Sequence, residues 1–155
     1  MKTFLKLIMV FAAFGFAIAK AAPTTTAAQK EAASKATAIK AVTDAVKSGD
    51  QEAIKAALNN QIALYPRFAA DIVTAALTVT AISGDIQKLI VRVAAFTAPN
   101  QIVSINQAID GIFGTQDKFG TVLKNLASSS AANGQAILTA ASGGGTTIKG
   151  LVSFN

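Results

Sequence analysis

The side chains able to hold or move a proton in this chain are carboxylates, lysines and a single tyrosine, Tyr65. His, Cys and Trp are absent. Without His or Cys the chain cannot form a Ser/His/Asp triad, a Cys/His dyad or a zinc site with His or Cys ligands. We therefore expect no catalytic residue, no cofactor and no metal, and we interpret the protein as a non-enzyme.

The densest group of carboxylates in the sequence is Asp44, Asp50 and Glu52. A functional interpretation is a paired-carboxylate or calcium site, but the EF-hand spacing is missing. Asp50 follows Gly49 and precedes a helical pattern, where an acidic side chain accepts free backbone N–H groups and favours the helix dipole. We interpret the group as helix caps and first-turn charges.

Asp71 stands out because the segment around it, residues 66–81, is mostly apolar. A buried carboxylate is costly unless it is paired. Arg67 lies one helical turn earlier, so we expect an ion pair between the two on a narrow solvated face. The alternative is a polar group in a pocket for a small apolar ligand or a partner. That candidate pocket would be lined by Tyr65, Phe68, Asp71, Ile72, Leu89 and Phe96, and the competing expectation is a dry core.

Hydrophobic periodicity predicts that helices position these residues. The expected helices lie near residues 26–48, 49–65, 66–81, 83–98, 99–113 and 115–127. Thr26 and Gln29 fit a capping box, and Thr115 is the expected N-cap of the last helix. Gly49 and Gly84 are expected to end helices, with Asp50 and Asp85 capping the next ones. The segment 66–81, polar along one stripe only, should be the most buried helix.

Two spacings in the sequence suggest a repeat. The triplet Ser-Gly-Asp occurs at 48–50 and 83–85, which is 35 residues apart, and Pro66 and Pro99 are 33 apart. A helix–turn–helix unit of about 34 residues is typical of helical solenoids, although these usually contain three or more units. We predict an all-α fold: a bundle of five to six helices, with two stacked helical hairpins as the alternative.

The two ends of the chain differ from its centre. Residues 1–19 have a basic start, a 13-residue apolar run and a small-residue site, which is typical of a secretory signal peptide cleaved near Ala19 or Ala21. We assign 20–127 to a helical domain and 128–155 to a weakly ordered tail rich in Ser, Gly and Ala. The protein is therefore expected to be exported, to a periplasm or outside the cell.

Charge narrows the classes of partner. Removing residues 1–19 takes Lys2 and Lys6 from the 14 basic residues, which leaves 12 against 8 acidic ones and a net charge of +4. The basic residues form no run, so we expect no nucleic-acid binding. The main hypothesis is a small exported helical protein that binds or packs against an unknown protein partner or an apolar small ligand. The alternatives are a membrane-associated or membrane-active envelope protein and a structural, self-associating secreted protein.

Overall fold

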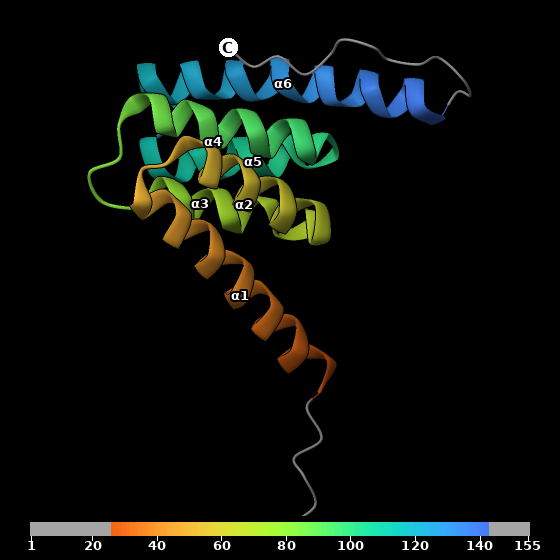
Figure 1. Cartoon of the computed structure of the whole chain (residues 1–155). Coiled ribbons are helices and arrows are strands. Elements are labelled where there is room, and N and C mark those ends of the chain that lie inside the picture. Colours follow the sequence, from red (N-terminus) through yellow and green to blue (C-terminus); the bar gives the residue numbers. More distant parts are fainter. Residues whose placement is uncertain (1–25, 143–155) are drawn as a thin grey trace, which may run out of the picture.

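The computed structural model describes residues 26–142 as six α-helices and two short 3₁₀ turns, with no strand in that range (Figure 1). The predicted all-α class is confirmed. The expected signal peptide and the last part of the expected tail, residues 143–155, lie outside the described residues. The elements are α1 (Ala27–Ser48), α2 (Gln51–Leu64), η1 (Pro66–Phe68), α3 (Ala69–Leu77), α4 (Gly84–Thr97), η2 (Pro99–Gln101), α5 (Ile102–Phe113) and α6 (Lys118–Ser142).

The first two helices begin and end as their sequence predicts. Thr26 and Gln29 form a full capping box at the start of α1. Gly49 ends α1 with a left-handed φ of 72°, a conformation that costs glycine little. Asp50 then caps α2, because its Oδ1 accepts the backbone N–H of Glu52 at 2.9 Å. Local turn chemistry therefore suffices to place this break in the chain.

The second Ser-Gly-Asp triplet has a different structure from the first. Ser83, and not Asp85, is the N-cap of α4, and its Oγ accepts the N–H of Ile86 at 3.3 Å. Gly84 is the first residue of α4 and ends no helix, so the predictions for Gly84 and Asp85 are wrong. The preceding helix already stops at Leu77, and the connecting turn contains Ala81 with a φ of 63°. The N-cap is therefore the third residue of the first Ser-Gly-Asp triplet but the first residue of the second triplet.

The true period of the chain is the 33 residues that separate the prolines. The N-caps Asp50 and Ser83 are also 33 apart, and α2 and α4 are both 14 residues long. The residue before each proline has nearly the same backbone angles, φ −135° and ψ 65° at Tyr65 and φ −126° and ψ 67° at Ala98. Four pairs at this offset are buried in both copies: Leu58 and Val91, Ile62 and Ala95, Ile72 and Ile105, and Ala76 and Ile109.

The two 33-residue units, each made of two helices, stack on one another. The pair α2–α3 lies against the pair α4–α5, with α2 packed on α4 and α3 on α5. Helix α1 covers the first pair and α6 covers the second, so α1 and α6 lie on opposite sides of the stack (Figure 1). The alternative of two stacked helical pairs with flanking helices is therefore the closer description of this bundle.

A single apolar core runs through the stack, and α3 is its centre. Five of the nine residues of α3 are buried, while Thr74 and Thr78 face solvent, as the polar stripe predicted. Helix α1 contributes to the core only through its second half, because its buried residues begin at Ala38. The alanines at positions 28, 32 and 36 are exposed, and the first turns of α1 extend beyond the other helices (Figure 1).

Helix α6 departs most from its prediction. Asp117, and not Thr115, caps it, since the N–H of Gly120 donates to Asp117 Oδ1 at 2.7 Å. The helix also continues to Ser142, so residues 128–142 are part of the helical domain and not of a tail that starts at 128. Packing accompanies this extension: Ser130, Ala131 and Gly134 are buried, and a Cβ at Gly134 would collide with the backbone of Phe96.

Candidate functional site

The six predicted pocket residues lie at three places in the described structure: Tyr65 and Phe68 at η1, Asp71 and Ile72 on α3, and Leu89 and Phe96 on α4. Tyr65 and Phe68 do meet, with ring centroids 5.7 Å apart and planes 28° from parallel. Ile72 is fully buried in the core. Leu89 and Phe96 lie half-buried on α4. The predicted residues therefore include an aromatic stack at η1 and side chains on α3 and α4 that range from fully buried to half-buried.

Asp71 belongs to an alternating set of charges between α1 and the start of α3. Lys35 Nζ lies 2.8 Å from Asp71 Oδ1, and Arg67 Nε lies 3.4 Å from Glu31 Oε1. The predicted pair of Arg67 with Asp71 is thus replaced by two pairs that cross between helices, because α1 lies alongside α3. The Arg67 guanidinium also sits 5.0 Å from the centroid of the Phe68 ring. We call Glu31, Lys35, Arg67, Phe68 and Asp71 the charged corner.

The carboxylates at 44, 50 and 52 have structural roles, as interpreted. Asp50 caps α2, Glu52 pairs with Lys55 at 2.7 Å, and Asp44 pairs with Lys40. The hydrogen bond from Lys40 holds the pKa of Asp44 below its ordinary value, aided by the nearby charge of Lys47. Within residues 26–142 no group of three or more carboxylates gathers in a way that could hold a metal ion.

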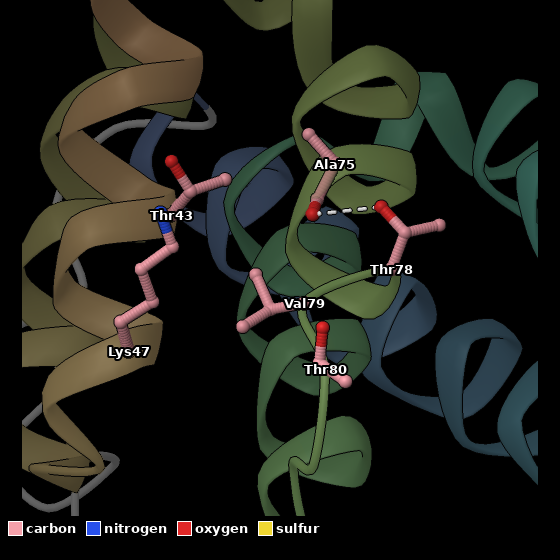
Figure 2. Close-up of a pocket in the computed structure, with 6 residues that line it drawn as sticks. All are labelled: Thr43, Lys47, Ala75, Thr78, Val79 and Thr80. Atoms are coloured by element: carbon pink, nitrogen blue, oxygen red, sulfur yellow. Dashed lines mark hydrogen bonds between the residues drawn. The ribbon is translucent and has the colours of Figure 1, made fainter.

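An open groove of about 440 Å³ lies between the end of α1 and the end of α3 (Figure 2). Its lining residues are Thr43, Lys47, Ala75, Thr78, Val79 and Thr80. In Figure 2, Val79 points from the α3 side toward α1. None of the predicted pocket residues is part of this groove.

The groove has few side-chain groups that could bind or react with a ligand. The Thr78 hydroxyl donates to the carbonyls of Thr74 and Ala75, and the Thr43 hydroxyl donates to those of Ile39 and Lys40. Both hydroxyl protons are therefore engaged in hydrogen bonds to their own helices. The two threonines present their methyl groups and the acceptor lone pairs of their oxygens. Lys47 is the one cation on its walls. A nucleophile paired with a base is not found among these six residues.

The equivalent corner of the second helical pair, around η2, is formed by stretches of sequence without charged residues. Residues 93–109 and 125–142 contain no Asp, Glu, Lys or Arg. The fold brings these two stretches together, because α6 packs closely on both α4 and η2. A Cβ at Gly134 would collide with the carbonyl oxygen of Phe96 and lie 3.1 Å from its carbonyl carbon. Glycine at 134 therefore sets how closely α6 approaches the end of α4.

The apolar stripe of α6 continues beyond this contact. Leu123, Ala127, Ala131 and Gly134 are buried at steps of three and four residues, and the next position, Leu138, is 49% exposed. Leu138 is uncovered because α4 ends at Thr97, one residue after the contact with Gly134. From Gly134 to Ser142 the helix rises by about 12 Å, and Figure 1 shows α6 running past the ends of α4 and α5.

A second exposed apolar residue lies at the same end. Val103, in the first turn of α5 just after η2, is 66% exposed. Lys124 Nζ lies 2.6 Å from Asp110 Oδ1, so α5 and α6 run side by side with early residues of α5 opposite later residues of α6. We call Phe96, Val103, Gly134 and Leu138, together with η2, the neutral corner. It is the candidate functional surface of this protein.

Sequence reasoning missed this surface. The sequence placed Leu138 in a weakly ordered tail, and it could not tell where the neighbouring helix ends. The signal that could have found it is the pair of charge-free runs at 93–109 and 125–142, which are the longest in the described part of the chain.

Among the described helices, none has both the length and the apolar content needed to cross a lipid bilayer. No family model, no curated protein and no solved structure matches this chain.

Proposed function

We propose that the protein is an exported helical binding protein without catalytic activity, and that it packs its neutral corner against an uncharged, apolar partner. The observation that carries the proposal is the exposure of Val103 and Leu138 on a part of the molecule without charges. Export is inferred from the basic start, apolar run and small-residue site of residues 1–19.

The free energy of burial gives this surface its capacity to bind. Burying a Val or Leu side chain completely is worth about 1.5–3 kcal/mol. A partner that covered the neutral corner would gain part of that energy from each residue, and it would remove no charge from water. Desolvating an ion costs several kcal/mol, so the absence of charges makes association at this corner less costly than at the charged corner.

A membrane-associated role is the second candidate. The net charge would be +4 once residues 1–19 are removed, and the apolar residues of the neutral corner could enter a lipid interface. Surface-binding helices usually carry lysines beside their apolar face, and residues 125–142 of α6 have none. An uncharged partner therefore fits this corner better than an anionic bilayer does.

The test is binding of an uncharged apolar dye, Nile red, followed by fluorescence. The wild-type protein should bind the dye, and the double variant Val103→Ser/Leu138→Ser should bind it at least several-fold more weakly. Leu64→Ser is the matched control, because Leu64 is 67% exposed and lies at the other corner, directly before Tyr65. It should bind like the wild type.

Two results would count against the proposal. Equal loss of dye binding in the Leu64→Ser control would mean that any exposed apolar residue suffices. Binding to vesicles with anionic lipid, but not to neutral vesicles, that survives Val103→Ser/Leu138→Ser would favour the membrane-associated alternative. Circular dichroism of each variant checks that the helical fold is retained.

A further inference from the structure

We infer that residues 118–142 are a third copy of the 33-residue unit, whose second helix, residues 135–142, is held straight at the end of α6 and can fold onto α5. We call residues 135–142 the strap. The straight α6 is the open form, and the folded hairpin is the closed form. Closing would cover Leu138 with the chain's own helices and so remove it from the neutral corner. The inference depends on the repeat and not on the identity of any partner.

The first half of α6 repeats the first helix of the other two units. Helix α6 packs on α4 as α4 packs on α2, which is how successive units of a repeat protein stack. Three buried residues of α4 are followed, 33 positions later, by three buried residues of α6: Ile90 and Leu123, Ala94 and Ala127, and Ala98 and Ala131.

The third unit has no turn between its helices because it has no proline there. Pro66 and Pro99 each follow a residue with non-helical backbone angles, since a proline ring disfavours the helical conformation of the residue before it. The next position in this series is Ala132, which has an N–H and no ring. The helix therefore continues through Ala132 to Ser142.

The exposed Leu138 is the counterpart of two core residues. Ile72 of α3 and Ile105 of α5 are fully buried, and Leu138 stands 33 residues after Ile105. Leu138 is nevertheless 49% exposed. It occupies the position at which the second helix of a unit meets the core, and the straight helix carries it away from that core.

The side of α5 that would receive the strap is less covered than the equivalent side of α3. Ala75 and Val79 of α3 line the groove against α1, so the opposite flank of α3 faces the second unit. That flank carries three buried residues: Ala69, Val73 and Leu77. Their counterparts on α5 are only half-buried: Ile102, Asn106 and Asp110. Lys124 of α6 pairs with the last of them. The strap would cover this flank of α5 as α5 covers α3.

The break needed for closing falls in a weak part of α6. Residues 128–134 contain three serines, an asparagine and a glycine, which are all less favourable in a helix than alanine. The open form is held by the helical hydrogen bonds through Ala132 and by the close contact of Gly134 with the backbone of Phe96. A proline at 132 would remove the hydrogen bonds and shift the balance toward the closed form.

Paramagnetic broadening from a single label tests the closing. Because the chain contains no Cys, Ser142→Cys provides a unique site for a nitroxide. In the open form residue 142 lies about 27 Å along α6 from Lys124, the partner of Asp110, so the label should leave the amide signals of 102–110 largely intact. With Ala132→Pro added, it should weaken those signals at least several-fold, while residues 135–142 keep helical chemical shifts.

Ala136→Pro is the matched control, because it breaks the same helix one turn out of register with Pro66 and Pro99. It should cause no broadening at 102–110. The signals of residues 26–127 show whether each variant keeps its fold. Loss of helical shifts at 135–142 in Ala132→Pro without broadening at 102–110, equal broadening with both prolines, or unfolding of the preceding helices by Ala132→Pro would each overturn the inference.

The effect of Leu138→Ser on stability is a second measurement. In the wild type Leu138 is exposed, so the urea midpoint should change little. In the Ala132→Pro background the midpoint should fall, because Leu138 would then be buried, and an equal change in both backgrounds would contradict closing. If closing failed while Nile red binding to the wild type still depended on Val103 and Leu138, the proposed function would stand alone. If closing occurred while those residues had no effect on dye binding, only the strap would stand.

Discussion

The two corners of this molecule occupy equivalent positions in a 33-residue repeat and yet have opposite surfaces. At η1, Arg67 and Asp71 pair with Glu31 and Lys35 of the neighbouring α1. At η2 the equivalent positions are Asn100 and Ser104, and the neighbouring helix is the uncharged end of α6. The backbone of the two corners is nearly the same. The repeat therefore fixes the architecture, and the side chains on its two corners decide what each can bind.

The two covering helices are also held in different ways. The first turns of α1 lie over the charged corner, where exposed ion pairs provide contacts worth about 0–1 kcal/mol each. Helix α6 is held over the neutral corner by close packing against the backbone of Phe96. Disrupting one contact should therefore change the free energy of unfolding little at the charged corner and much more at the neutral corner.

The largest expected effect comes from Gly134→Ala. Alanine is favoured over glycine in a helix by up to about 1 kcal/mol. Here its Cβ would collide with the carbonyl of Phe96, and overpacking of this kind costs about 1–3 kcal/mol. We expect a net loss of stability in urea denaturation, with α6 displaced from the end of α4.

Gly111→Ala is the matched control for this substitution. Gly111 also lies inside a helix, but a Cβ there would meet no atom within 4 Å. It should raise the free energy of unfolding by about 0.5–1 kcal/mol. Stabilisation by both substitutions would contradict the account of how α6 is held.

The repeat itself predicts a stabilising substitution, Asn106→Val. Asn106 stands 33 residues after the buried Val73, and its Oδ1 is buried without a hydrogen-bond partner among the described residues. An unsatisfied buried polar group costs about 1–3 kcal/mol, and valine loses a few tenths of a kcal/mol in helix propensity. We expect a gain of about 1 kcal/mol in chemical denaturation. Destabilisation would mean that position 106 is not equivalent to 73.

A smaller effect is expected for the ion pairs of the charged corner. A double-mutant cycle with Lys35→Gln and Asp71→Asn should give a coupling free energy of about 0.5 kcal/mol, because both side chains are well exposed. Screening by salt should reduce the coupling at about 1 M NaCl. A coupling that stays the same in high salt would contradict the view that this contact is a solvated ion pair.

The smallest effect concerns protonation of Asp44. The hydrogen bond from Lys40 lowers its pKa, so Lys40→Gln should raise that pKa in an NMR titration. A lowered pKa in the folded state stabilises the fold above the unfolded-state pKa, and this contribution is lost as the pH falls through the folded-state value. The variant should therefore be less sensitive to acid over that range. An unchanged pKa would show that Lys40 does not hold this carboxylate.

Much of the fold was predictable because local chemistry decides it. The capping box at Thr26, the turn at Gly49 and Asp50, and the helix starts after Pro66 and Pro99 depend on neighbours within a few residues. The helix break before Gly84 was not predictable in the same way. There α3 stops at Leu77, and Ala81 takes a left-handed φ that its side chain disfavours.

The site was less predictable because it depends on where helices end relative to one another. The partners of Arg67 and Asp71 lie on α1, so spacing within one helix assigned the wrong ion pairs. Leu138 is exposed only because α4 stops beside Gly134. The Ser, Gly and Ala content of 128–142 suggested a tail, whereas glycine at 134 is what the contact with α4 requires.

The most direct test of the neutral corner is to map, residue by residue, where an apolar contact forms. ¹H–¹⁵N spectra would be recorded as Nile red is added. The account predicts that the shifted signals fall within residues 99–106 and 134–142. Shifts centred on Glu31, Lys35, Arg67 and Asp71, or spread evenly over the helices, would contradict it.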